Sequence, residues 1–283
     1  MEQLAQASLN GLMMGWIYVL IALGLALIFG ILRIIQFAHG EIYMLGAYIS
    51  YALVGSHLSL WPALGIACAC MALVGHLLER CFFRRLRGQV HRSIIFSLGL
   101  LLSIQSSAVL AFGLGERVLP RLSDRSLSLL SVEFPLDRVI AVAPAFVLVG
   151  LVFAFLKRTR QGLAVVACAQ DPEGAVLQGI DPNSVASMVM SLGCALAAVG
   201  GTVAGSILKL SPFMGEQTLS KALVIIVLGG MGSLGGTVAA ALLIGLLDSL
   251  VNVYLGPATA AISPLLIVIG ILLVKPEGLL GHA

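Results

Sequence analysis

Charged residues are scarce in this chain of 283 residues. Asp, Glu, Lys and Arg together make up 10% of the sequence, whereas hydrophobic residues make up 59% and the mean hydropathy is +1.07. A soluble domain carries roughly 25% charged residues, so there is too little charge here to cover a surface that faces water. The chain is therefore predicted to be an integral membrane protein. Its formal net charge of +3 is too small to indicate a nucleic-acid partner.

Several sequence motifs are also missing. The five cysteines form no Cys-x-x-Cys pair, and Cys68 and Cys70 would point to different faces of a helix. Neither a metal site nor a disulfide framework is therefore predicted. The sequence has no Gly-Lys-Ser/Thr phosphate loop and no HExxH or GxSxG motif, so the chain is predicted to be neither an enzyme nor a cofactor-binding protein. No basic segment precedes the first apolar run, so no cleaved signal peptide is expected.

Long apolar runs are the main feature that the sequence does contain. Membrane-spanning strands alternate apolar and polar residues over about ten positions, whereas these runs are continuous, which predicts helices. Helices also satisfy their own backbone hydrogen bonds in lipid. At about 20 apolar residues per crossing, the prediction is an all-α polytopic membrane bundle of about nine spans, within a range of eight to ten. The predicted spans are 10–31, 35–55, 60–79, 93–113, 138–156, 185–208, 221–233, 236–252 and 258–274.

Two clusters of basic residues predict the orientation of the bundle. One cluster lies within residues 80–92 and the other within residues 157–160. The positive-inside rule places both clusters in the cytoplasm, and the two predicted spans between them agree with this. Counting spans away from the clusters predicts an N-terminus outside the membrane and a C-terminus inside.

The stretch RIIQFAHGEIYMLGAY, residues 33–48, places polar residues between two apolar runs. The apolar residues 42–54 alone are too few to cross a bilayer of about 30 Å at 1.5 Å per residue. A spanning helix is therefore predicted to begin near Ile34 or Ile35. The polar side chains of the stretch would then lie inside the membrane, where a charged carboxylate costs about 2.5–3.5 kcal/mol on insertion scales.

Two interpretations of this polar stretch remain open. In the first, Gln36, His39 and Gly40 share one helical face, because they are three and four residues apart, and this face lines a translocation path. Glu41 falls off this face in a regular helix, and a break at Gly40 would change its position. In the second interpretation, the stretch is a short turn at the membrane interface.

A second polar spot lies late in the sequence. The run LGGMGSLGG, residues 228–236, has too many glycines for a stable helix, which predicts a broken or re-entrant segment that either lines a substrate cavity or serves close packing. Asp248 lies in an apolar run, where an acid indicates a functional site; a structural hydrogen bond, for example to Asn252, is the alternative. The residues predicted to line a substrate path are Gln36, Phe37, His39, Gly40, Glu41, Gly229, Gly230, Gly232, Gly235, Gly236 and Asp248.

The longest predicted cytoplasmic connection, residues 157–185, contains its own helix signals. Asp171 is an N-cap, Pro172 fits the first helical position, and Glu173 places an acid in the first turn. Gly179 is a plausible stop. A helix of one to two turns is therefore predicted, and it either docks into a partner protein or packs on its own bundle.

Four stretches together resemble one known family. NGLMMGWIYVLIALGLALIFGILRIIQFAHGEIYMLGAY (10–48), RTRQGLAVVACAQDPEGAVLQGID (158–181), KALVIIVLGGMGSLGGTVAAALLIG (221–245) and VKPEGLLG (274–281) are similar, in this order, to segments of permease subunits of branched-chain amino acid ABC importers. The resemblance implies a single permease domain over residues 1–283 in a bacterial cytoplasmic membrane. It also implies a second permease, identical or different, two cytoplasmic ATPase subunits and a periplasmic binding protein.

The same resemblance implies that residues 157–185 form the segment that couples the permease to its ATPases. The residues implied in this coupling are Arg160, Gly162, Asp171, Pro172, Glu173, Ala175, Gly179 and Ile180. The wider family also imports urea, short amides and other small carboxylated solutes, which remain alternative substrates. A proton-coupled secondary transporter, in which His39, Glu41 and Asp248 relay protons, is a further alternative. A strong inverted repeat would favour it, and none is evident in the sequence.

Overall fold

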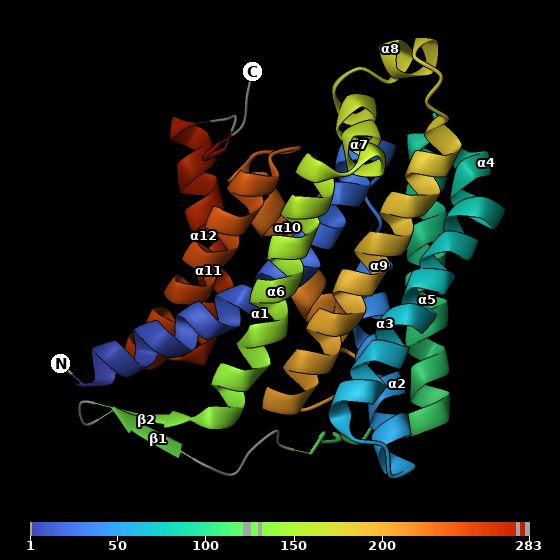
Figure 1. The fold of residues 1–283 in the computed structure, drawn as a ribbon. Helices are drawn as coiled ribbons and strands as arrows, with labels where there is room; N and C mark the ends of the chain where they lie inside the picture. Colours follow the sequence, from blue (N-terminus) through green and yellow to red (C-terminus); the bar gives the residue numbers. More distant parts are fainter. Residues whose placement is uncertain (1, 121–125, 130–131, 276–277, 281–283) are drawn as a thin grey trace.

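The computed structural model describes residues 2–120, 126–129, 132–275 and 278–280, and long helices packed side by side dominate it (Figure 1). A short antiparallel hairpin, β1 (Ser126–Leu129) and β2 (Val132–Pro135), connects two of the helices. The helices are α1 (Glu2–Leu32), α2 (His39–Gly55), α3 (Leu60–Leu78), the π-helix η1 (Glu79–Phe83), α4 (Arg84–Leu86), α5 (Val90–Phe112), α6 (Leu136–Arg158), α7 (Arg160–Gln170), α8 (Pro172–Leu177), α9 (Pro182–Ile207), α10 (Met214–Gly229), α11 (Leu234–Leu255) and α12 (Pro257–Val274).

The predicted all-α membrane bundle is confirmed, but nine full crossings are not. Each of the nine predicted spans falls on a helix of the described chain. Only five of the described helices are long and apolar enough to cross a membrane, or six if the bent pair of α6 and α7 forms one span. The main reason is that α2 and α10 have only 17 and 16 residues, because both begin inside the bundle rather than at its edge.

The bundle has two distinct ends (Figure 1). We call the end that carries α7 and α8 the α8 end, and the opposite end, which carries the β1–β2 hairpin, the hairpin end. Helix α1 begins at the hairpin end, whereas α12 finishes at the α8 end. The chain therefore crosses the bundle an odd number of times, as the sequence predicts, while the side of the membrane that each end faces stays a prediction.

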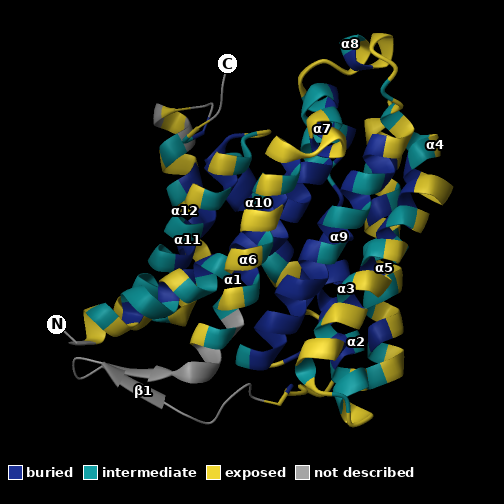
Figure 2. Cartoon of the chain, in the orientation of Figure 1, coloured by how far each residue is buried: buried dark blue, intermediate teal, exposed yellow. Residues whose placement is uncertain are grey.

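Helices α1 and α9 form the interior of the bundle, and glycines let them approach closely. Figure 2 shows both helices largely buried, with exposed residues concentrated on α3, α5 and α12. A Cβ added to Gly24 of α1 would lie 2.7 Å from the carbonyl oxygen of Gly193 of α9. Small residues are the usual means by which membrane helices reach such short separations, so this crossing depends on glycine.

Two groups of three helices have inverted orientations relative to each other, which the sequence analysis did not find. Helices α1, α2 and α3 run in directions opposite to α9, α10 and α11, and α1 packs along α11 as α9 packs along α3 (Figure 1). In both halves a long helix is followed by a non-helical link and a short helix that begins inside the bundle. The structure therefore contains an inverted arrangement of helices that is not evident in the sequence. The sequence trace is weak, although His39-Gly40-Glu41 and Met214-Gly215-Glu216 stand at matching places and share a Gly-Glu pair.

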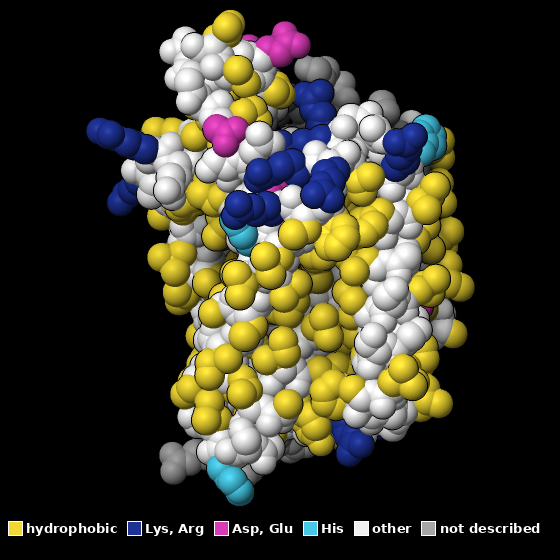
Figure 3. All heavy atoms as spheres, turned by 90° about the vertical axis from the view of Figure 1, so that its right-hand side faces the viewer, with side chains coloured by type: hydrophobic (Ala, Val, Ile, Leu, Met, Phe, Trp, Pro, Cys, Tyr) yellow, Lys and Arg dark blue, Asp and Glu magenta, His cyan; other side chains and the backbone are white. Residues whose placement is uncertain are grey.

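The outer surface over α3, α4 and α5 fits a membrane environment. Figure 3 shows hydrophobic side chains spread over the middle of this face, while Lys and Arg gather toward the α8 end. Exposed residues of this basic cluster include Arg80, Arg85 and Arg92. Contact with lipid requires the hydrophobic middle of this face. The basic cluster toward the α8 end is the feature from which the orientation was predicted.

Candidate functional site

Helix α2 begins later than the sequence predicted. Helix α1 ends at Leu32, Arg33 has a positive φ of 51°, and α2 starts only at His39. The predicted start near Ile34 or Ile35 is therefore wrong, and Gln36 shares no helical face with His39. The length argument failed because extended residues rise about 3.3 Å each, so the non-helical link covers depth that a longer helix would otherwise have to span.

The polar side chains of this stretch are nevertheless deep in the protein. Gln36, His39 and Glu41 have no exposed surface. The Gln36 amide and the Glu41 carboxylate also have no hydrogen-bond partner among the described residues. Buried polar groups are normally paired, so such groups call for water, a proton or a ligand. This burial favours a polar lining over an interfacial turn, and the role of these residues in a path stays a prediction.

Two helix starts meet beside Glu41. A Cβ on Gly215 of α10 would lie 2.6 Å from the carbonyl oxygen of Gly40 of α2, so the two backbones touch. Glu41 and Glu216 stand in the first turns of these two helices and interact electrostatically. A helix N-terminus favours a negative charge, which offsets part of the repulsion between the two acids. Phe37, just before the start of α2, is half-buried.

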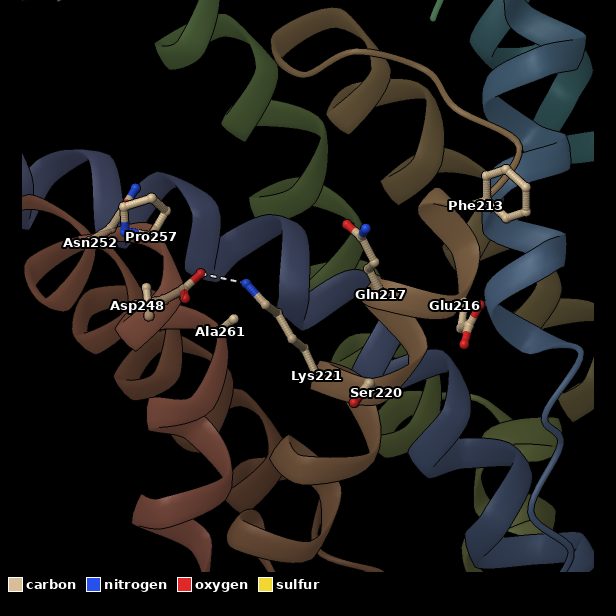
Figure 4. Close-up of a pocket in the computed structure, with 10 residues that line it drawn as sticks. Phe213, Glu216, Gln217, Ser220, Lys221, Asp248, Asn252, Pro257 and Ala261 are labelled. Carbon is tan, nitrogen blue, oxygen red and sulfur yellow. Dashed lines mark hydrogen bonds and ion pairs between the residues drawn. The ribbon is translucent and has the colours of Figure 1, made fainter. Parts of the chain in front are cut away.

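A cavity of about 660 Å³ opens between α10, α11 and α12 (Figure 4). Glu216 lies on one side of it and Asp248 on the other, so the cavity begins next to the buried polar stretch. Phe213, Pro257, Ala260 and Ala261 supply apolar wall. The polar residues that line the cavity are Glu216, Gln217, Ser220, Lys221, Asp248 and Asn252.

Asp248 is paired with a lysine that the sequence analysis did not single out. The Lys221 ammonium lies 2.6 Å from Oδ2 of Asp248. The Tyr18 hydroxyl donates to the same oxygen at 3.0 Å and accepts from Lys221 at 2.9 Å. The ammonium also lies 5.0 Å from the centre of the Tyr18 ring, a favourable cation–π position. Asn252, the partner suggested from the sequence, lines the same cavity instead.

This ion pair lies at membrane depth and is still partly exposed. Asp248 stands about 20 Å from the start of α11 and about 10 Å from its end, at 1.5 Å per residue. The side chains of Lys221 and Asp248 are 27% and 17% exposed. Ionised groups inside membranes face a water-filled cavity or another protein rather than lipid. The mouth of the cavity at this ion pair is therefore unsuited to contact lipid.

The glycine-rich run forms the predicted break, but this break does not border the polar cavity. Helix α10 ends at Gly229, and Gly230 and Gly232 have φ values of +97° and +100°, which glycine adopts without strain. Ser233 then caps α11 by accepting a hydrogen bond from Gly236 at 3.1 Å. Among the described residues, the run contributes nothing to the polar cavity; Gly235 is exposed and Gly236 packs on Gly229.

Gly232 lies instead beside a second, smaller cavity at the α8 end. This cavity of about 260 Å³ is bordered by residues of α1, α6 and α7 and is mostly apolar. Its position near the turn favours the packing interpretation of the glycines. Their role in a substrate path stays a prediction.

The helix signals in residues 157–185 are confirmed. The Asp171 side chain accepts a hydrogen bond from the amide of Gly174 at 3.0 Å, Pro172 occupies the first position of α8, and Gly179 has a φ of +79°. Helix α7 was not predicted. It begins at Arg160 after an 80° bend from α6, and Thr159 caps it by accepting from the buried Gly162.

Helix α8 projects from the end of the bundle (Figure 1). Ala175 is buried against the chain and Ile180 is half-buried, whereas Val176 and Leu177 are 52% and 87% exposed. Glu173 is also exposed. Two large apolar side chains on a projecting helix leave apolar surface uncovered, which is typical of a contact site for another protein.

Comparisons with known proteins agree with this architecture. The family model described as the permease component of branched-chain amino acid transport systems matches residues 7–274. The high-affinity branched-chain amino acid transport system permease protein LivH of Escherichia coli K12 is 29% identical, covering 98% of this chain and 95% of that protein. The corresponding BraD protein of Pseudomonas aeruginosa and LivH of Salmonella typhimurium are each 30% identical with the same coverage. No solved structure matches the chain at a significant level.

Proposed function

The chain belongs to the branched-chain amino acid permease family and is a permease subunit of an ABC importer, and from this premise we propose that its polar cavity lines half of the translocation path. A subunit of this kind is a multi-pass protein of the inner membrane and is not itself an enzyme. An ABC import system includes ATPase subunits and a substrate-binding protein in general. We propose a second permease, identical or different, two cytoplasmic ATPases and a periplasmic binding protein as its partners.

The observation that carries this proposal is the partly exposed ion pair of Lys221 and Asp248 at membrane depth. Lipid does not solvate such a pair, so a second permease covers the mouth of the cavity and encloses water between the two subunits. Glu216 carries the polar lining toward the centre of the bundle, where the buried Glu41 lies next to it. The transported solute is a branched-chain amino acid, as for the named relatives.

Coupling to ATP hydrolysis takes place at the α8 end, which we assign to the cytoplasm. The exposed Val176 and Leu177 of α8 insert into an apolar groove of the ATPase subunit. The caps at Asp171 and Asp181 fix the starts of α8 and α9, and only a short link separates the two helices. Movement of α8 then reaches the interior through α9, which packs on α1, α2 and α3, and access to the cavity switches from one end to the other.

The experiment reconstitutes the permease with its ATPases and binding protein in proteoliposomes and measures ATP-dependent leucine uptake. Leu177→Glu should abolish both uptake and copurification of the ATPase, because a charge would enter an apolar contact. Leu114→Glu is the matched control, since Leu114 is also exposed, at 69%, but follows α5 at the hairpin end. Retention of the ATPase by the Leu177 variant would contradict the docking role. Leucine uptake without ATPase subunits would contradict the importer itself.

A further inference from the structure

The ion pair in the polar cavity has the composition needed to recognise both charges of an amino acid. We propose that Lys221 and Asp248 bind the zwitterionic head group of the passing substrate by exchange: the substrate α-carboxylate takes the place of Asp248 on Lys221, and the substrate α-ammonium takes the place of Lys221 on Asp248. This inference rests on the proposed function and names the two side chains that hold the head group of its substrate, an aliphatic α-amino acid in its zwitterionic form.

Charge balance is the first argument. The two side chains lie on different helices, α10 and α11, and both open into one cavity (Figure 4). When a zwitterion enters between them, every charge still has an opposite charge beside it. Removing one partner from a buried pair is costly because it leaves an uncompensated charge. An amino acid avoids this cost, whereas urea or a short amide carries no charge to replace either partner.

Tyr18 is the second argument. Its hydroxyl both donates to Asp248 and accepts from Lys221, so it remains a hydrogen-bond partner of either residue when the pair opens. In the closed arrangement its ring also lies 5.0 Å from the Lys221 ammonium. The hydroxyl therefore supports the closed and the open arrangement alike, which lowers the barrier to exchange.

The walls of the cavity are the third argument. A volume of about 660 Å³ lies within the range of about 300–1,000 Å³ typical of small-molecule sites. Gln217, Ser220 and Asn252 place hydrogen-bonding groups around the pair, and Pro257 and Ala261 place apolar surface on the α12 side. The other acid in the cavity, Glu216, lies across from the pair (Figure 4) and attracts the ammonium group of an entering substrate. A polar head and an aliphatic side chain are thus both accommodated.

The test removes both charges together, so that neither is left unpaired. The double variant Lys221→Met with Asp248→Asn is assembled into the complete importer, and leucine uptake and ATPase activity are measured in proteoliposomes. Uptake should fall about tenfold to a hundredfold, the effect of losing hydrogen bonds to charged groups, while the ATPase activity stimulated by the loaded binding protein is retained. The matched control is Lys209→Met with Glu116→Gln, which removes an exposed ion pair outside the cavity and should leave uptake unchanged.

A second variant separates recognition from a structural role. Exchanging the residues, Lys221→Asp with Asp248→Lys, restores an ion pair between α10 and α11 but moves the positive charge to the other helix. Thermal stability should return while uptake stays low, because the substrate head group then meets reversed charges. Full uptake by the exchanged variant, or by the neutral variant, would overturn the inference. Failure of the wild-type complex to import any branched-chain amino acid would instead count against the proposed function.

Discussion

Replacing Glu79 with alanine should destabilise the protein much more than the same replacement at Glu116. The Glu79 carboxylate has no exposed surface, and it accepts hydrogen bonds from Arg84 at 3.1 Å, from Arg87 and from Ser187. Arg84 also donates to Ser187 at 3.0 Å. One buried carboxylate therefore ties the end of α3 and η1 to the first turns of α9.

The size of the effect follows from burial. Removing one partner of a buried ion pair costs about 3–5 kcal/mol. The Arg84 and Arg87 side chains are 36% and 26% exposed, so water can solvate them when the carboxylate is removed. The expected loss of stability is therefore at the lower end of this range, about 3 kcal/mol. Glu116 lies 2.5 Å from Lys209, but the two side chains are 57% and 68% exposed, and such surface pairs contribute about 0–1 kcal/mol.

Thermal unfolding of the purified protein in detergent is the appropriate assay. A thiol-reactive fluorophore reports unfolding, because Cys168 and Cys194 are 4% and 0% exposed and become reactive only when the bundle opens. The exposed Cys70 and Cys81 react before heating and set the baseline. With about 2–4 °C of Tm per kcal/mol for a chain of this size, Glu79→Ala should lower the Tm by about 6–12 °C and Glu116→Ala by less than about 4 °C.

The comparison between the two variants decides whether the reasoning holds. Equal melting temperatures for Glu79→Ala and Glu116→Ala would refute it, since they would mean that burial of the Glu79 carboxylate adds nothing. Glu79→Gln should fall between wild type and Glu79→Ala, because the amide keeps the size of the side chain and one acceptor oxygen but loses the charge.

Three further predictions concern glycine packing and helix caps. Gly24→Leu should prevent normal packing of the bundle, since a Cβ there meets the Gly193 carbonyl oxygen at 2.7 Å. Gly99→Leu is the control, because no atom lies within 4 Å of a Cβ added there. In size-exclusion chromatography the Gly99 variant should elute as a folded particle and the Gly24 variant should not. Asp171→Ala should destabilise α8 by about 1 kcal/mol and speed amide hydrogen exchange in residues 172–177, while Asp171→Asn should retain protection. Hydrogen bonds from the backbone amides of Asn183 and Ser184 hold the pKa of Asp181 below its ordinary value. The stability that the Asp181 carboxylate adds is therefore present above the ordinary pKa and is lost as the pH falls through the lowered pKa. Asp181→Asn should weaken the fall in Tm below about pH 4, and an unchanged pH profile of Tm would contradict this.

The helix signals show which features local sequence is able to predict. The caps at Asp171 and Asp181 join a side chain to an amide two or three residues away, so the residues that decide them are neighbours in the sequence. The break at Gly230 and Gly232 is equally local, because it depends on the φ angles of single residues. The position of a segment within the bundle is not decided by neighbouring residues. The same glycines were among the residues predicted to line a substrate path, and the structure places them at the α8 end.

The sequence by itself determined that this protein is a helical membrane protein, because its shortage of charge excludes a water-facing surface and its apolar runs exclude membrane-spanning strands. Only the tertiary structure decided that α2 begins at His39 and that Asp248 meets Lys221 and Tyr18, 27 and 230 residues away. Packing among helices α1, α10 and α11 brings these side chains together, and a pattern read along one segment carries no information about which distant segment will lie against it.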